Sequence, residues 1–94
     1  MSFTITYGWE VFKKDKPKLS ASVLKQVQHA VETKLLVQPE KFGKPLRNSL
    51  KSYRSLRVGD YRMIFNIQGS TIKVLAIAHR SISYKIALVR LFSN

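Results

Sequence analysis

Cysteine is absent from this chain of 94 residues, and acidic residues are scarce. Without cysteine there can be no disulfide, no thiolate metal ligand and no cysteine nucleophile. The five Asp and Glu residues are scattered, so they do not form the carboxylate cluster that a two-metal nuclease requires. His29 has no partner at metal-ligand spacing. We therefore expect no metal and no cofactor.

Long hydrophobic runs are also missing. No apolar stretch is long enough to cross a bilayer, and residues 1–10 lack the basic and apolar regions of a secretory signal. These absences predict a cytoplasmic protein. The length fits a single domain, residues 1–94, and 45% apolar residues are enough for one packed core.

Positive charge is what the chain has in excess. Seventeen Lys and Arg residues face five acidic ones, which gives a formal net charge of +12. So large an imbalance in so short a chain favours a polyanionic partner, either nucleic acid or an acidic protein. The alternative is a basic protein that is simply soluble, with no polyanionic partner.

Hydrophobic periodicity predicts a strand and two helices in the first part of the chain. Residues 3–7 alternate apolar and polar side chains, as a strand does. Residues 9–16 form a short amphipathic segment, in which Trp9 is expected to be a core anchor rather than a base-stacking platform. A longer helix is predicted from Ser20, as its N-cap, to about residue 37.

The second part of the chain predicts an antiparallel meander. Residues 40–52 are polar and basic, and are expected to be an extended loop. Three strands follow, at residues 53–58, 61–67 and 71–78. Residues 83–92 are expected to form a short C-terminal helix, with a final strand as the competing prediction. The predicted fold class is α+β, with helices packed on one face of the sheet and the other face open for a ligand.

An arginine-rich set of side chains begins in the predicted loop and continues onto the strands. Its members are Lys44, Arg47, Lys51, Arg54, Arg57 and Arg62. The guanidinium fork can bind two phosphate oxygens at once, and the nearby Tyr53, Tyr61 and Tyr84 can stack on unpaired bases. A charge run is usually a solvated surface, but the arginine content and the strand placement favour nucleic-acid binding, with Tyr53 among the RNA-binding residues.

A second group of polar side chains follows the last predicted strand. RNA cleavage without a metal needs a base for the 2′-hydroxyl, charge stabilisation at the phosphate, and a proton for the leaving 5′-oxygen. His79 can exchange protons near neutral pH, and Arg62 and Arg80 can stabilise phosphate charge. Tyr84 can stack on a base or deliver a proton. The alternative, a structural His79 and a surface Arg80, stays open on spacing alone.

Two segments resemble the signature of the RelE/ParE toxin superfamily. Residues 56–65 read LRVGDYRMIF and are preceded at residues 43–47 by GKPLR. Residues 79–84 read HRSISY, in which an arginine lies four residues before a tyrosine. The predicted order of elements agrees with that family, so the resemblance covers nearly the whole chain.

The resemblance implies a RelE-like fold and a toxin of a type II toxin-antitoxin system. Such toxins enter the ribosomal A site and cleave messenger RNA by 2′-hydroxyl attack, so the implied partners are an antitoxin, the ribosome and mRNA. Arg62 resembles the phosphate-stabilising arginine, and Arg80 falls on, or two residues from, a second functional arginine. Tyr84 resembles the C-terminal catalytic or stacking tyrosine. A ParE-like gyrase inhibitor is the alternative, and a non-catalytic nucleic-acid-binding module is a third reading.

The sequence departs from the family pattern in one place. Well-known members carry lysines on the strand before LRVGDYR, and one of them acts as general base. Arg54 and Ser55 stand at those positions here. Because an arginine is always protonated, it is a poor base. Either His79 acts as the general base instead, or Lys51 does, or the activity is weak.

Overall fold

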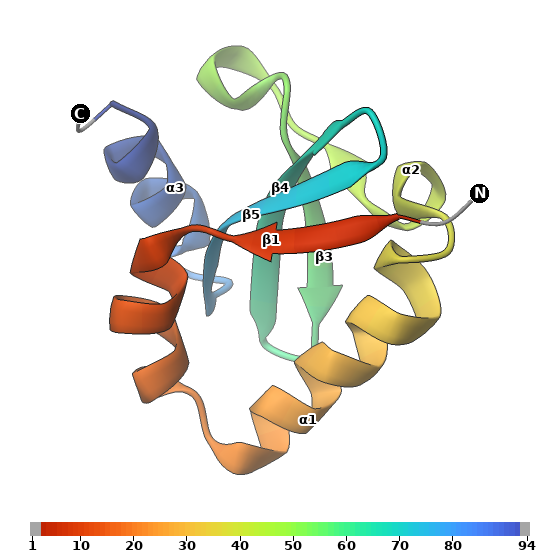
Figure 1. Ribbon diagram of the computed structural model, residues 1–94. Helices are drawn as coiled ribbons and strands as arrows, with labels where there is room; N and C mark the ends of the chain where they lie inside the picture. The colour runs from red at the N-terminus through yellow and green to blue at the C-terminus, as the bar shows by residue number, and fades with distance from the viewer. Residues whose placement is uncertain (1–2, 93–94) are drawn as a thin grey trace.

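The computed structural model describes residues 3–92. Its five strands form one sheet in the order β1-β5-β4-β3-β2 (Figure 1). The strands are β1 Thr4–Tyr7, β2 Lys44–Pro45, β3 Arg54–Val58, β4 Tyr61–Gln68 and β5 Thr71–His79. β1 runs parallel to β5, and the other three pairings are antiparallel. The predicted three-strand meander is confirmed, with two further strands at its edges.

Helical segments connect and cover these strands. They are η1 Val11–Asp15, η2 Lys16–Lys18, α1 Ala21–Ala30, η3 Val31–Leu35, α2 Pro39–Phe42, η4 Asn48–Leu50 and α3 Ser83–Phe92. The predicted start of the long helix is confirmed, because the Val23 amide donates to Ser20 Oγ at 3.2 Å. The predicted C-terminal helix is confirmed as α3. Within residues 3–92, none of these helices has the length and apolar character needed to cross a membrane.

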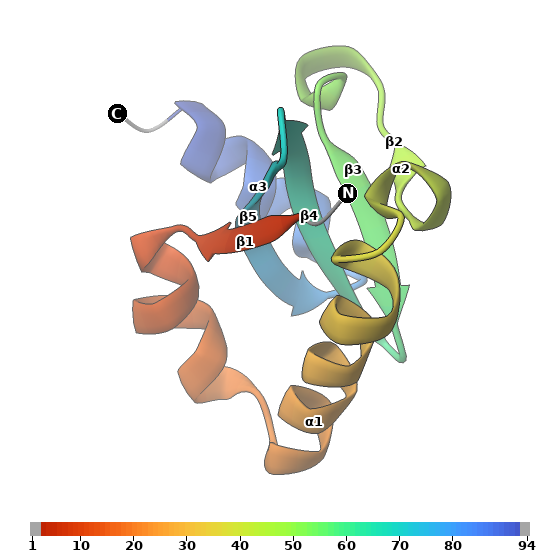
Figure 2. The ribbon, with the colours of Figure 1, turned by 45° about the vertical axis from the view of Figure 1, so that its right-hand side comes forward.

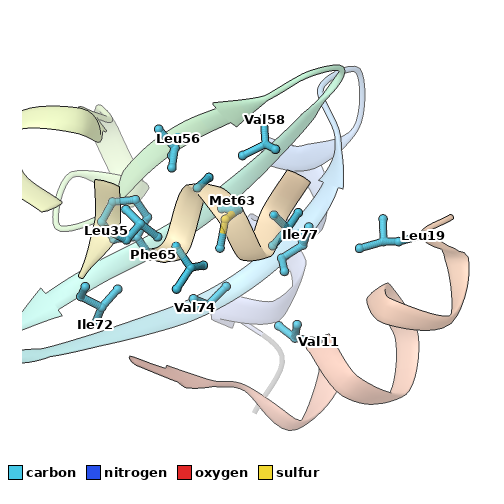
Figure 3. Close-up of a cluster of buried hydrophobic side chains, with 13 residues drawn as sticks. Val11, Leu19, Leu35, Leu56, Val58, Met63, Phe65, Ile72, Val74 and Ile77 are labelled. Carbon is cyan, nitrogen blue, oxygen red and sulfur yellow. The ribbon is translucent and has the colours of Figure 1, made fainter. Parts of the chain in front are cut away.

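The main core lies between α1 and one face of the sheet. Side chains from β3, β4 and β5 point toward the helix, as Figure 3 shows for Met63, Phe65 and Ile77. Met63, Phe65 and Leu35 are fully buried. Because each such side chain contributes about 1.5–3 kcal/mol when it leaves water, this layer supplies most of the stability.

The second face of the sheet is covered by α3, so the prediction that the helices share one face is wrong. Ala87 of α3 clusters with Ile64 and Ala76, which are the strand neighbours of Met63 and Ile77 in the main core. Figures 1 and 2 show α1 and α3 on opposite sides of the sheet. β4 and β5 are apolar on both faces, so each face needs a cover, and periodicity does not say which helix supplies it.

Two predictions for the connecting segments are also wrong. Trp9 is 66% exposed and is not a core anchor. The wide turn η1 buries Val11 in its place, and Trp9 instead lies under the Lys14 ammonium, 5.5 Å from the ring centroid. Residues 40–52 are not one extended loop, because they contain α2, β2 and η4. These elements are too short to leave a periodic pattern in the sequence.

A buried ion pair closes the free edge of β5. β1 ends at Tyr7, which pairs with Val74, so β5 beyond Val74 lacks a strand partner on the side opposite β4. The Ile77 amide instead donates to Asp15 Oδ2 at 2.8 Å, and Arg90 Nη1 donates to the Leu75 carbonyl at 3.1 Å. Arg90 and Asp15 also bind each other through contacts of 2.6 and 2.7 Å. Hydrogen bonding to Asp15 raises the pKa of Arg90, and the pair ties α3 to η1.

Candidate functional site

Three elements bring polar side chains together on the face that α3 covers. Ser55 comes from β3, Arg62 from β4 and Tyr84 from the first turn of α3. Arg62 Nη1 donates to Ser55 Oγ at 3.2 Å, and the guanidinium carbon lies 5.8 Å from the centroid of the Tyr84 ring. Ser55 is 2% exposed, whereas Tyr84 is 38% exposed. The Arg62 guanidinium is therefore held between a buried hydroxyl and an accessible aromatic ring.

A groove of about 400 Å³ lies beside this cluster. Its walls are the segment from β2 to η4 on one side and α3 on the other. They include Lys44, Arg47, Asn48, Leu50, Tyr84 and Leu88. Lys44 and Arg47 are exposed, whereas Leu50 is buried. Apolar walls with a few cations and one aromatic ring suit a ligand that carries both flat rings and negative charge.

The strand register concentrates positive charge on this face. Arg57 on β3 lies directly opposite Arg62 on β4, and like charges in that position destabilise a sheet. The Arg57 side chain turns back so that Nε donates to the Gly59 carbonyl at 2.8 Å. The same side chain lines a hollow beside α1, with Lys25 and His29, and does not line the groove beside Tyr84.

Arg80 joins the same region from the end of β5. Its amide donates to the Asp60 carbonyl at 2.8 Å, and its Nε lies 3.9 Å from Asp60 Oδ1 in an exposed ion pair. Arg62 is paired with Ala78, and Arg80 follows in the turn just after β5. Arg80 therefore lies near the start of β4, where Arg62 is.

His79 is not brought to this cluster. It is paired with Tyr61, and the two rings meet edge-on with centroids 5.7 Å apart. Tyr61 packs against the α1 core, so His79 belongs to the face opposite Arg62 and Tyr84. Its Nδ1 is hydrogen-bonded to Ser81 Oγ at 2.8 Å. His79 also lines a separate hollow, of about 410 Å³, between η1 and α3.

A β-bulge explains the placement of His79. The pairing of β4 with β5 shifts by one residue, because Phe65 pairs with Val74 whereas Ile64 pairs with Ala76. Leu75 is the extra residue, and every β5 side chain beyond it is turned to the other face relative to an unbroken ladder. Without the bulge, His79 would share a face with Arg62.

Arg54 also points away from the groove. Its Nη1 donates to the Gly43 carbonyl at 2.8 Å and to the Glu40 carbonyl at 3.0 Å. These bonds hold the corner between α2 and β2 against β3. Arg54 therefore has a structural role, and its guanidinium lies on the α1 side of the sheet, away from the groove.

The two remaining predicted residues lie near the far end of the groove face. Tyr53 is half-buried and packs under α3 with the cluster around Leu50 and Ile64. Lys51 is exposed in the turn between η4 and β3. The structure thus brings Arg62 to Tyr84, and Tyr84 to a groove with Lys44 and Arg47. Arg80 lies against Asp60 at the start of β4, and Arg57, Lys51 and Tyr53 do not line the groove.

Sequence reasoning missed the contact between Ser55 and Arg62. A two-residue turn at Gly59-Asp60 sets Arg57 opposite Arg62 and therefore Ser55 opposite Ile64. The contact was nevertheless predictable from the sequence, because counting residues away from the Gly59-Asp60 turn along both strands places Ser55 and Arg62 on one face of the sheet. The pairing of Lys44 with Ser55 left no such signal, because η4 separates the two strands.

Residues 9–84 match the family described as the ParE toxin of type II toxin-antitoxin systems, parDE. The chain belongs to this toxin family. It is 32% identical to toxin RelG of Mycobacterium tuberculosis over 87 residues, which cover 90% of this chain and 99% of RelG. It is 43% identical to toxin RelE of the same organism over 53 residues, and that match spans 54% of this chain and only 55% of RelE.

Solved structures agree with the assignment to this toxin family. The toxin-antitoxin complex RelBE2 of Mycobacterium tuberculosis superposes with a TM-score of 0.77 at 29% identity, covering 85% of this chain and all (100%) of that one. A mutant of the Escherichia coli toxin RelE in the free state superposes with a TM-score of 0.73, covering 98% of this chain and 100% of that one. At 20% identity, the second likeness shows the fold alone. The predicted RelE-like α+β fold and the resemblance to the superfamily are confirmed.

Proposed function

We propose that this toxin is a ribosome-dependent endoribonuclease that cleaves messenger RNA by attack of a 2′-hydroxyl on the adjacent phosphate. The observation that carries the proposal is the Arg62–Ser55–Tyr84 cluster at the edge of a basic groove. The described residues that line the groove include a guanidinium and a phenol but no carboxylate. Such groups suit a reaction in which the RNA supplies its own nucleophile and the protein stabilises charge.

The arginines act on the scissile phosphate. Arg62 and Arg80 bind its non-bridging oxygens and stabilise the charge that builds up as the 2′-oxygen attacks. Because Ser55 holds Arg62 through only one of its N–H groups, the remaining donors of the fork are available for phosphate. Tyr84 stacks on a base beside that phosphate, as aromatic side chains do in many RNA-binding proteins.

The surrounding cations bind the RNA backbone. Lys44 and Arg47 line the groove, whereas Arg57 lines a separate hollow beside α1. Each phosphate that they neutralise releases condensed counterions, so binding becomes weaker as salt rises. Lys51 at the margin extends the same positive surface.

The partner that we propose for the free toxin is a cognate antitoxin. The solved relative RelBE2 is a toxin-antitoxin complex. A net charge of +12 favours an antitoxin segment that is acidic or apolar and orders itself on the basic face. Such a segment would compete with RNA for the groove.

The test is a reconstituted translation reaction in which the ends of a ribosome-bound message are mapped. The toxin is expected to cut the message, and Arg62→Ala to lower the cleavage rate by about 100-fold or more. The control is Lys13→Ala, which removes one exposed charge from η1, outside the groove. The Lys13→Ala variant is expected to cleave like the wild type.

Three outcomes would reject the proposal. An intact message together with inhibition of DNA gyrase would assign the ParE-like activity instead. Weaker RNA binding in Arg62→Ala with no separate loss of turnover would indicate a binding module that does not catalyse. Full cleavage by folded Arg62→Ala and Arg80→Ala variants would show that the site lies elsewhere.

A further inference from the structure

Cleavage by 2′-hydroxyl attack leaves one requirement that the arginines cannot meet. The departing 5′-oxygen needs a proton, and a guanidinium stays protonated throughout. His79 lies on the opposite face of the sheet. Candidate groups on the face of Arg62 that carry a transferable proton include the Ser55 hydroxyl, the Tyr84 phenol and, through its pairing with Ser55, the Lys44 ammonium. Ser55 is buried and accepts a hydrogen bond from Arg62, so it is not available to the RNA.

The strand register places Lys44 beside this cluster. Lys44 on β2 is paired with Ser55 on β3, and residues directly opposite each other project from the same face of a sheet. The Arg62 guanidinium in turn lies 3.2 Å from Ser55 Oγ. Lys44 and Tyr84 line the same groove. The Tyr84 ring lies 5.8 Å from the Arg62 guanidinium carbon, so a phosphate held by Arg62 would lie next to the groove that Lys44 lines.

The backbone that carries Lys44 is held firmly, although its side chain is exposed. Arg54 Nη1 donates to the carbonyls of Glu40 and Gly43 and fixes the corner before β2. Gly43 itself lies against the buried Phe65 ring, where an added Cβ would come within 2.5 Å of Cζ. None of the ion pairs within residues 3–92 includes Lys44. A fixed backbone and a cation outside these ion pairs suit a group that acts on a substrate.

We infer that Lys44 is a further catalytic residue, the general acid for the leaving 5′-oxygen; this inference rests on the proposed function. The 2′-oxygen forms a bond to phosphorus, and its proton passes to water. The bond between phosphorus and the 5′-oxygen breaks, and the Lys44 ammonium gives a proton to that oxygen. The products are a 2′,3′-cyclic phosphate and a free 5′-hydroxyl. Water then returns a proton to the Lys44 amine.

The experiment compares two messages in the same ribosome-bound reaction. One is ordinary RNA, and the other carries sulfur in place of the bridging 5′-oxygen at the cleaved linkage. Because a thiol has a pKa of about 8.5, the bridging sulfur can leave as a thiolate without receiving a proton. The variants are Lys44→Met, which removes the donor, and Lys44→Arg, which keeps the charge but cannot release a proton. Lys41→Met is the matched control, since it removes an exposed lysine from the neighbouring α2.

On ordinary RNA, both Lys44 variants are expected to lose at least about 100-fold in cleavage rate, the usual contribution of a general acid. On the sulfur-substituted message, both are expected to recover to within about threefold of the wild type. Lys41→Met should behave like the wild type on both messages. A defect that persists with sulfur, or normal cleavage by Lys44→Arg on ordinary RNA, would overturn the inference. Rescue of Tyr84→Phe instead would assign the proton to Tyr84.

These outcomes separate the inference from the proposed function. If the wild-type toxin cleaves ordinary RNA and Arg62→Ala does not, the proposed function stands whatever Lys44 does. If the wild-type toxin cleaves neither message, the proposed function fails and the role of Lys44 fails with it.

Discussion

Removal of the Asp15 carboxylate is expected to be among the most damaging single changes in this protein. Asp15→Ala leaves the Arg90 guanidinium, whose side chain is only 6% exposed, with a single longer carboxylate contact, to Glu10 Oε2 at 3.8 Å. It also leaves the Ile77 amide without the acceptor that replaces a strand neighbour. Breaking a buried ion pair from one side costs about 3–5 kcal/mol, because the remaining charge stays buried. A domain of this size has only about 5–10 kcal/mol of stability in total.

The double variant Asp15→Leu/Arg90→Met tests where that cost comes from. No buried charge remains in it, so the penalty for an unpaired ion disappears. The Ile77 amide and the Leu75 carbonyl are still left without partners, at roughly 1–3 kcal/mol each. The double variant is therefore expected to be no less stable than Asp15→Ala, although it changes two residues.

Denaturant and thermal unfolding measure these differences. For a domain of about this length, each kcal/mol shifts Tm by about 4–8 °C, so Asp15→Ala is expected to lower Tm by about 12 °C or more. Asp60→Asn is the control, because its ion pair with Arg80 is exposed and is worth less than about 1 kcal/mol. A loss of less than 1 kcal/mol in Asp15→Ala would refute the reasoning about the edge of β5.

Four further measurements follow from the fold and the site. Burial raises the pKa of Tyr7, so the phenol keeps its proton to higher pH in the folded state than in the unfolded chain, and stability should fall as pH rises above about 10. Tyr7→Phe should flatten that decline, and an unchanged decline would show that Tyr7 does not cause it. Gly43→Ala should lower the free energy of unfolding in urea by about 1–3 kcal/mol and slow RNA cleavage, because the new Cβ would clash with Phe65 and displace β2. Full stability in this variant would show that the Phe65 ring moves aside. His79→Gln should cleave RNA within about threefold of the wild type, since His79 lies on the other face; a loss of about 100-fold would return His79 to the site. Affinity for a short single-stranded RNA should fall steeply with salt, with a logarithmic slope of about −0.7 for each phosphate contact, and a flat response would exclude a phosphate-dominated interface.

The elements with strong local signals were predictable from the sequence. Ser20 predicted the start of α1 because a serine hydroxyl can cap a helix, and in the structure its Oγ accepts a hydrogen bond from the Val23 amide. Gly59 and Gly69 mark the turns of the meander, and both adopt positive φ, at 62° and 60°, where glycine carries no steric penalty. The sequence of the two β2 residues did not predict a strand, because they form one only through their pairing with β3.

Which side chains face the groove was only partly predictable. The turn at Gly59 fixes the register of β3 against β4, and so places Arg62 with Arg57. Counting forward from the turn at Gly69 gives the wrong face for His79, because the bulge at Leu75 adds one residue to β5. A bulge depends on tertiary contacts, such as the bond from Arg90 to the Leu75 carbonyl, and these are not visible in local sequence.

The tie between Asp15 and Arg90 also imposes an order of assembly. The two residues are separated by 75 positions, so their contact closes most of the chain into one loop, and such distant contacts tend to form late in folding. During synthesis every strand leaves the ribosome before Arg90 does. In a growing chain, all five strands and most of the basic residues therefore emerge before Arg90 can attach α3, the helix that carries Tyr84, to η1.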